Sequence, residues 1–358
     1  MKRFVLKAAL ALIAVSAFAI TSAQAQERTL KLSTQNPKGH PITEGAYKFA
    51  DLVAAKSGGK LKVNVFAGGT LGSDMAVASA MQGGTVDMNI GNSGILAAQV
   101  PAFAVFDFPF MFTNTKEADA VVDGPFGKMM HKKLEEKGLV GLAYFELGFR
   151  NMTNSKRPLY KVEDIAGLKM RVIPSPINLA WVKALDANPV PMAFGEVYGA
   201  LESKAIDGQE NPLTVIAANK LYEVQKYLAM TNHVYNPQSV VMSKKTWDSL
   251  DATNKKIVTD AANEAAKFQR ELTRKQAAEL VDTLKKGGMT VTEFGPAELA
   301  KFSDKMRPVI AQFGVSVGQD VVSQLQAELT KARAAAPAKA TAKPATKPAA
   351  KAAAPAAK

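Results

Sequence analysis

The chain has 358 residues, no cysteine and a formal net charge of +13 at pH 7. The lack of cysteine excludes thiol catalysis, disulfide bonds and thiolate metal sites. Residues 1–25 carry three of the net positive charges and residues 331–358 carry seven, which leaves +3 on residues 26–330. The central part is therefore near neutral, and the overall basic charge is poor support for nucleic-acid binding.

The N-terminal segment has the order of a secretory signal peptide. Positive Lys2, Arg3 and Lys7 precede an apolar run over residues 8–20, and small residues follow up to Ala25. The run has roughly 13 residues, whereas a membrane-spanning helix needs about 20. The pattern predicts export to the periplasm with cleavage after Ala25. A membrane anchor is the alternative interpretation.

Between the two ends, stretches in which every second residue is apolar alternate with stretches in which apolar residues recur every three to four positions. Strands are expected around residues 30–32, 61–65, 86–90, 139–145, 168–173 and 189–192. Helices are expected from Pro41 to the Gly58-Gly59 pair and over residues 73–82, 177–185 and 196–202. This alternation predicts an α/β architecture.

Two later segments shape the expected organisation. Residues 207–212 (DGQENP) are interpreted as a turn that enters another helix. The apolar period over residues 252–286 predicts a helix of about 35 residues, ~50 Å long. Such a helix could brace two domains or break near its middle. No linker separates the α/β blocks, which favours two domains with a cleft between them.

The other end of the chain has a biased composition. Residues 331–358 contain only Ala, Lys, Pro, Thr and one Arg. Such a segment has almost nothing apolar to bury, so it predicts a disordered basic tail. The tail could contact anionic lipid or the cell wall, or it could simply stay solvated.

Motifs of enzymes are missing from the sequence. The three histidines are scattered, and there is no zinc-protease HExxH, no nucleophile elbow and no Walker loop. The most phosphate-loop-like run, residues 68–73 (GGTLGS), lacks the lysine and is interpreted as a loop leading into a helix. Its N–H groups could still face an anion. We expect no catalytic residue, no metal site and no cofactor.

Two arginines are candidates for ligand binding. Arg171 lies inside an apolar strand, on the face opposite to Leu168, Met170 and Val172, and Arg150 follows the preceding strand. A guanidinium is a planar donor fork that matches a carboxylate with two hydrogen bonds. From the pattern alone, a ligand role, a structural ion pair and solvent exposure all remain open.

Three runs closely resemble the substrate-binding subunits of TRAP transporters, the DctP-like proteins of tripartite ATP-independent periplasmic systems. They are residues 167–172 (GLKMRV), 191–198 (PMAFGEVY) and 207–212 (DGQENP). Shorter runs agree, at residues 71–74 (LGSD), 148–150 (GFR) and 231–233 (TNH). The resemblance covers residues 28–330 in order, and the tail lies outside it.

The resemblance implies a two-lobed periplasmic binding protein fold of the α/β class, with a ligand cleft between the lobes and a long helix spanning both. Lobe I would comprise residues 26–148 plus 237–276, and lobe II residues 149–236 plus 277–330. It also implies that the cleft closes around the ligand, and that the closed form docks on integral membrane permease subunits. The family is mostly monomeric, so we expect a monomer, although some members dimerise through a long helix.

The resemblance assigns candidate ligand-binding residues by position. Arg171 matches the family's carboxylate-clamping arginine, Arg150 its second ligand arginine and Asn211 its cleft asparagine. Phe194 matches an aromatic residue that packs on the ligand. We therefore expect a small-molecule carboxylate as the ligand, with no nucleic acid among the partners.

Other matched positions concern the choice of ligand. Gln35 and Asn92 match first-lobe positions that vary with the substrate. Pro174 stands where similar sialic-acid binders carry asparagine, which argues against sialic acid. A monocarboxylate, a dicarboxylate, a keto acid and a sugar acid all remain open. Two rival functions are an enzyme that uses the same cleft and a periplasmic sensor or scaffold that uses the basic tail.

Overall fold

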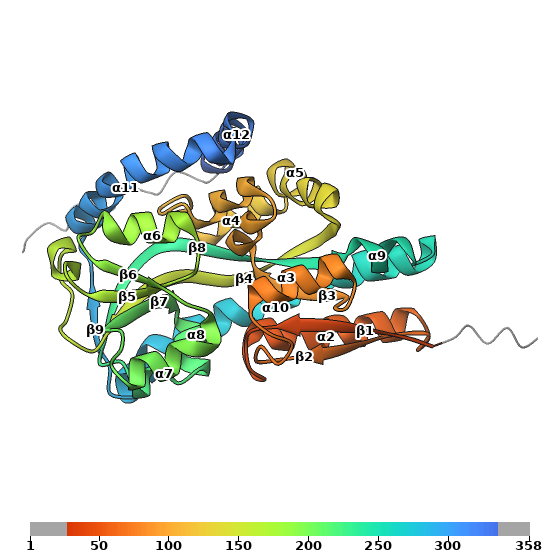
Figure 1. Cartoon of the computed structure of the whole chain (residues 1–358), viewed down its shortest axis with the longest axis horizontal. Coiled ribbons are helices and arrows are strands. Elements are labelled where there is room, and N and C mark those ends of the chain that lie inside the picture. The colour runs from red at the N-terminus through yellow and green to blue at the C-terminus, as the bar shows by residue number, and fades with distance from the viewer. Residues whose placement is uncertain (1–26, 336–358) are drawn as a thin grey trace, which may run out of the picture.

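The computed structural model describes residues 27–335, in which helices pack on both faces of a central sheet (Figure 1). The predicted signal peptide and residues 336–358 of the predicted tail lie outside the described residues. No helix in the described range is long and apolar enough to cross a membrane.

Within residues 27–335 the strands form one nine-stranded sheet in the order β2-β1-β3-β8-β4-β7-β5-β6, and β9 pairs with β8. The strands are β1 (Arg28–Thr34), β2 (Leu61–Phe66), β3 (Met88–Asn92), β4 (Leu139–Asn154), β5 (Lys169–Val172), β6 (Asn188–Pro191), β7 (Gly208–Pro212), β8 (Tyr227–Ser243) and β9 (Thr290–Glu293). Parallel pairs lie at both ends of the sheet, and β8 pairs antiparallel with β3 and β4 in the middle. The predicted α/β architecture is therefore confirmed.

The helices cover the sheet as follows. They are α2 (Pro41–Lys56), α3 (Asp74–Gly83), α4 (Thr115–Val122), α5 (Pro125–Leu134), α6 (Pro176–Lys183), α7 (Val197–Glu202), α8 (Leu213–Ala218), α9 (Lys244–Asp248), α10 (Ala252–Lys286), α11 (Pro296–Val317) and α12 (Gln319–Ala335). Figure 1 shows α4, α5, α6, α11 and α12 on one side of the long strands, and α2, α8 and α10 on the other.

Local chemistry explains where helix α2 begins. The Nδ1 atom of His40 accepts a hydrogen bond from the Ile42 amide at 3.1 Å, and Pro41 occupies the first turn. Proline suits this place because its missing N–H would have no partner inside the helix. Phe49 and Val53 then bury the apolar face of α2 against the sheet.

The predicted long helix is one continuous helix. The Asp251 carboxylate caps its start by accepting a hydrogen bond from the Asn254 amide at 2.7 Å. Along its length α10 contacts α2, β4, α8 and β9. Its contacts therefore extend from α2, which packs beside β2, to β9, and the alternative of a break near its middle is wrong.

The long strands β4 and β8 connect the two halves of the molecule. Their register shifts at three places, one of them between Glu146 and Gly148, where Gly148 has a φ of 111°. A residue other than glycine would be strained in that conformation. Such irregularities bend a strand and change the direction of its side chains. They lie beside the predicted lobe boundary at residue 148, which itself stays a prediction.

Two expectations about local structure were wrong. Residues 208–212, interpreted as part of a turn, form strand β7, which pairs antiparallel with β4 from Arg150↔Pro212 to Asn154↔Gly208. The strand expected over residues 139–145 continues to Asn154. Polar residues and a glycine in both segments, together with Pro212 in the first, are typical of loops, but pairing inside the sheet satisfies their backbone groups.

The start of the tail also differs from the prediction. Residues 331–335, expected to be disordered, continue helix α12. Ala, Lys and Arg are strong helix formers, so the same composition permits a helix once neighbouring turns are packed. Leu325 and Leu329 are buried in the core, and the Arg333 guanidinium donates a hydrogen bond to the Met111 carbonyl at 3.3 Å.

Candidate functional site

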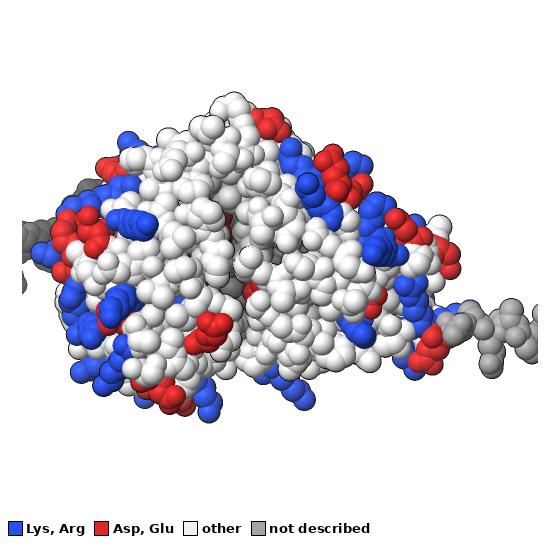
Figure 2. Space-filling view, in the orientation of Figure 1, with Lys and Arg blue, Asp and Glu red and all other residues white. Residues whose placement is uncertain are grey.

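A cleft of about 640 Å³, including the space open to solvent at its mouth, lies where the two halves of the molecule meet. Figure 2 shows the surface hollowed near the middle of the molecule. All six predicted ligand residues line this cleft: Gln35, Asn92, Arg150, Arg171, Phe194 and Asn211. Residues more than 170 positions apart in the chain therefore meet in one place.

A second hollow, which shares Ser73 and Phe194 with the cleft, lies between the glycine-rich run and the segment around Phe194. Gly68, Gly69 and Gly72 face Phe194 and Glu196 across an opening. Ser73 ends the run, and its hydroxyl accepts a hydrogen bond from the Ala76 amide at 3.4 Å at the start of α3. The interpretation of this run as a loop leading into a helix is confirmed.

Arg171 is buried in the wall of the cleft, on strand β5. Its Nε and Nη2 atoms donate hydrogen bonds to the Met192 carbonyl at 3.1 and 2.9 Å, and its Cζ lies 5.9 Å from the centre of the Phe194 ring. Within the described residues it forms no salt bridge. Burial and the nearby charge of Arg150 lower the pKa of Arg171 to about 10. The guanidinium is therefore charged at neutral pH and lacks a carboxylate partner in residues 27–335.

Arg150 lies in the same cleft but in a different electrostatic state. Its Nη2 atom donates to the Glu210 carboxylate at 2.8 Å and to the Glu210 carbonyl at 2.5 Å, and its Nε atom also pairs with the carboxylate. Its Nη1 atom lies 3.5 Å from Asn236 Oδ1. The positive charge of Arg150 is thus balanced within the protein, which the sequence did not reveal.

Glu210 is held in its ionised form inside the core. Burial favours its neutral form, but the charge of Arg150 and the contact with His233 outweigh burial and lower the pKa of Glu210 to about 2. The His233 Nε2 atom lies 3.3 Å from the carboxylate. Both side chains are buried, so the Arg150–Glu210 pair is a fixed part of the cleft wall.

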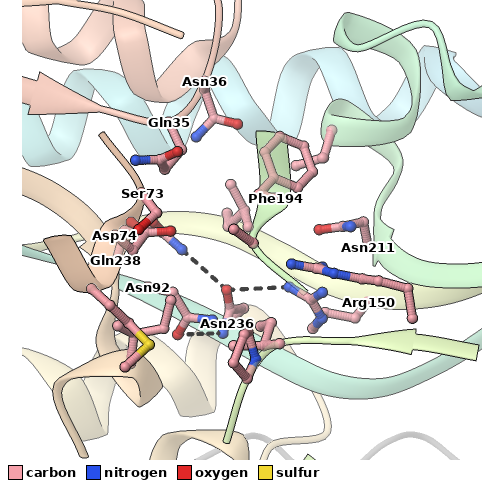
Figure 3. A pocket seen from close by; sticks show the side chains of 18 residues that line it. Gln35, Asn36, Ser73, Asp74, Asn92, Arg150, Phe194, Asn211, Asn236 and Gln238 are labelled. Atoms are coloured by element: carbon pink, nitrogen blue, oxygen red, sulfur yellow. Dashed lines mark hydrogen bonds between the residues drawn. The ribbon is translucent and has the colours of Figure 1, made fainter. Parts of the chain in front are cut away.

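Asn211 and Phe194 contribute a polar and an apolar surface to the same side of the cleft (Figure 3). Asn211 is buried on β7, and its side-chain nitrogen donates to Gln209 Oε1 at 2.5 Å. Phe194 is half-buried at the start of a single helical turn before α7.

The first-lobe candidates lie across the cleft from them (Figure 3). Asn92 ends β3, where its Oδ1 atom accepts hydrogen bonds from the Gly94 amide at 2.8 Å and from Asn236 Nδ2 at 3.1 Å. Gln35 follows β1 and donates to the Gly72 carbonyl at 2.8 Å.

Comparison with known proteins identifies the family. Residues 32–316 match the family described as "Bacterial extracellular solute-binding protein, family 7" (DctP). The chain belongs to this family. It is a TRAP solute-binding protein of the two-lobed α/β class and not an enzyme, as predicted.

Three relatives illustrate the similarity. The 2,3-diketo-L-gulonate-binding periplasmic protein YiaO of Escherichia coli K12 is 38% identical, over 79% of this chain and 86% of its own. A TRAP periplasmic solute-binding protein from Ochrobactrum anthropi, solved with the C-terminus bound in the ligand-binding pocket, is 48% identical with a TM-score of 0.78, and the match covers 87% and 97% of the two chains. The sugar acid binding protein DctPAm from Advenella mimigardefordensis, solved in complex with galactonate, is 38% identical with a TM-score of 0.84, covering 86% and 99%.

The cleft of this solute-binding protein contains polar residues that the sequence analysis did not select. Ser73 and Asp74 enter it from the start of α3, and Asn236 and Gln238 from the middle of β8 (Figure 3). Gln238 donates to Asn236 Oδ1 at 3.0 Å. The signal on β8 was the alternation of polar residues along a strand of high apolar content. The signal for Asp74 was its place in the LGSD run.

Proposed function

We propose that this protein captures a small organic acid in the periplasm and delivers it to the membrane permease subunits of a TRAP transporter. The proposal is supported chiefly by one observation. The buried guanidinium of Arg171 in the cleft forms no salt bridge within residues 27–335. A buried charge without a counter-ion is unfavourable, so an anion that enters the cleft is favoured. Guanidinium has five N–H donors, so donors remain for a carboxylate after the bonds to Met192.

The other predicted residues receive distinct roles in this proposal. Arg150 gives directed hydrogen bonds to a second ligand oxygen and adds little net charge, because Glu210 balances it. Asn211 binds the same end of the ligand, and Phe194 packs against its apolar side. Gln35 and Asn92 contact the far end.

The relatives support an acid as the ligand, since the E. coli protein is named for diketogulonate and the Advenella protein was solved with galactonate. We assign lobe closure to the irregular middle of β4 and β8, at the predicted boundaries 148/149 and 236/237. Closure excludes water, which strengthens the pairing of Arg171 with a carboxylate. The ligand then shifts the open–closed equilibrium toward the closed form.

A thermal-shift screen of the mature protein against organic acids tests the proposal. An acid present at about 100 times its dissociation constant is expected to stabilise the protein by ~2.7 kcal/mol. The matched control for each sugar acid is the corresponding sugar alcohol, which lacks the carboxylate and is expected to cause no shift. An equal shift from acid and alcohol, or no shift from any sugar acid, keto acid or dicarboxylate, would contradict a carboxylate-binding function.

Truncation after Ala335 separates transport from a sensory or scaffold role of the tail. Helix α12 ends at Ala335, so the cut leaves the described fold intact. We expect acid affinity by calorimetry to stay within about twofold of the full-length value, and reconstituted uptake with the permease to be unchanged. Lost uptake with intact binding would favour a tail-dependent partner. A gain in affinity would indicate that the chain's own end competes for the cleft; in the Ochrobactrum relative a C-terminus is bound in the ligand-binding pocket.

A further inference from the structure

The backbone of Glu146 is held by a side chain instead of a neighbouring strand. The Glu146 N–H donates to Gln269 Oε1 at 2.8 Å, and the Gln269 Nε2 atom donates to the Glu146 carbonyl at 2.7 Å. A carboxamide has the same donor and acceptor as a peptide group, so these two bonds match those that an adjacent strand would make. Strand β7 pairs with β4 over residues 150–154, and before that stretch Gln269 of α10 takes the place of a strand beside Glu146.

The Gln269 side chain is itself restrained. It is completely buried, and its Nε2 atom also donates to Thr273 Oγ1 at 2.7 Å, one helical turn further along α10. Helix α2 approaches so closely that a Cβ atom on Gly45 would lie 2.7 Å from Gln269 Cγ and 2.7 Å from the Phe145 ring. Close packing and the extra hydrogen bond therefore favour the orientation of the carboxamide that matches the Glu146 backbone.

The side chain of Glu146 adds a second connection to the same helix. Its Oε2 atom accepts hydrogen bonds from Arg274 Nε at 2.9 Å and from Arg274 Nη2 at 2.6 Å. On the other edge of β4, Glu146 stands opposite Pro237 of β8, which has no N–H to donate. The backbone N–H, the backbone carbonyl and the carboxylate of Glu146 are thus all bonded to one short stretch of α10. We call its three residues, Gln269, Thr273 and Arg274, the Glu146 anchor.

The Glu146 anchor lies directly beside the irregular middle of β4. The register with β8 shifts between Glu146 and Gly148, and Gly148 has a φ of 111°. Leu147 and Arg150, which follow Glu146 along the strand, line the cleft. The anchor therefore separates the part of β4 that is tied to α10 from the part that enters the cleft.

Helix α10 packs differently on the two sides of the anchor. The buried residues between Val258 and Ala266 belong to a core that also contains α2 and β1. Thr273 is the last buried residue of α10 before Leu284, and Leu284 belongs to a separate core with α7 and α8. The anchor is thus the last buried attachment of α10 on the side of the first core.

From this arrangement we propose that Gln269 is a positioning residue for ligand capture, which ties Glu146 to α10 so that the bend of β4 during lobe closure begins at Leu147. The inference rests on the proposed function, to which lobe closure belongs, and deepens it by naming a residue that controls closure. A fixed starting point for the bend restricts the directions in which the lobes move relative to each other. Arg171 and the first-lobe residue Asn92 then meet around a bound acid in one orientation, with a smaller loss of conformational freedom on binding.

Gln269→Met tests the inference, because it keeps the length of the side chain and removes both bonds to the Glu146 backbone. Hydrogen exchange of the Glu146 amide is expected to become about 10–100-fold faster. Since the chain has no cysteine, Asp51→Cys on α2 and Glu202→Cys on α7 place one spin label on each predicted lobe of the full mature chain. Pulsed electron–electron measurements without acid are expected to give a broader distribution of lobe-to-lobe distances in Gln269→Met than in the labelled parent protein.

Two further variants make the result decisive. Gln276→Met changes a half-buried glutamine of α10 outside the anchor, and as the matched control it is expected to change neither measurement. Thr273→Val removes only the hydroxyl that orients Gln269, so it is expected to give a smaller change in the same direction and replaces Gln269→Met if that variant does not fold. A distance distribution equal to that of the parent in both Gln269→Met and Thr273→Val, even with a lower melting temperature, would mean a merely structural role and would overturn the inference.

Acid binding separates this inference from the proposed function. The probe is galactonate, the acid in the complex of the Advenella relative, and its affinity by calorimetry is expected to fall about tenfold in Gln269→Met, because fewer conformers are competent to close. If galactonate binds the parent, Gln269→Met and Gln276→Met equally well, the positioning role is wrong and the proposed function stands. If no organic acid binds the parent protein, the proposed function fails together with the inference.

Discussion

Arg171→Ala is expected to lose binding of small organic acids by at least about 100–1,000-fold, because removal of one partner of a buried ion pair costs ~3–5 kcal/mol. The variant is expected to stay folded. The guanidinium bonds to a single carbonyl oxygen, that of Met192, and makes no salt bridge within the described residues. Isothermal calorimetry measures the loss, and circular dichroism checks the fold.

The direction in which a substitution at Arg171 changes the melting temperature provides a second test of the clamp. The pKa of Arg171 is lowered from its usual value to about 10, so burial disfavours the charged form in the folded protein. This shift corresponds to a cost on the order of 3 kcal/mol. Arg171→Met, which keeps the length and removes the charge, is therefore expected to melt at or above the wild-type temperature without ligand and to show no ligand-induced shift.

Arg171→Lys is the control for geometry. It keeps a positive charge and loses the planar donor fork, so we expect intermediate affinity. Affinity within about twofold of wild type in Arg171→Ala would reject the clamp. A large loss of melting temperature in both Arg171→Ala and Arg171→Met would mean that Arg171 stabilises the fold, which contradicts the unpaired charge described above.

Glu210→Gln is expected to destabilise the protein by ~3–5 kcal/mol, because it leaves the buried guanidinium of Arg150 without its counter-ion. The pKa of Glu210 is lowered to about 2, which agrees with a carboxylate that stabilises the fold in its ionised form. A carboxylate with a lowered folded pKa stabilises the fold above its unfolded pKa and loses that contribution as the pH falls toward 2. The loss of stability in Glu210→Gln should therefore be fully present at pH 7. Urea unfolding at pH 7 measures it.

The double variant Arg150→Met/Glu210→Gln is the matched test of this pair. Replacing both members of a buried ion pair often costs little, because no charge is left unpaired. We expect the double variant to recover most of the stability lost in Glu210→Gln. Destabilisation that is additive across the two positions would show that the pair is not coupled.

Much of the fold could be predicted from the sequence, because the local spacing of apolar residues indicates where helices and strands form. The α/β alternation and the continuous helix over residues 252–286 follow from apolar spacing and are present as expected. Residues 208–212 and 331–335 were assigned wrongly, since their composition is typical of a turn and of a disordered tail. Pairing with β4 and packing of α12 outweigh those local preferences.

The sequence predicted which residues line the candidate site better than it predicted how their charges are balanced. The alternation on β5 placed Arg171 opposite its apolar neighbours, and the family resemblance selected six of the residues that line the cleft. Asp74 and Asn236 were not selected, because the LGSD run and the polar alternation on β8 do not by themselves indicate which side chains face a cleft. Their importance depends on which side chains lie next to them in space.

The sequence by itself determined the class of fold, the family and the presence of a carboxylate-matching arginine on an apolar strand, because these depend on short-range order along the chain. Only the tertiary structure decided which arginine keeps its charge available. Arg150 and Glu210 are 60 positions apart in the sequence and meet through the pairing of β4 with β7. Charge balance depends on distance in space, so the unpaired state of Arg171 appears only once the sheet is assembled.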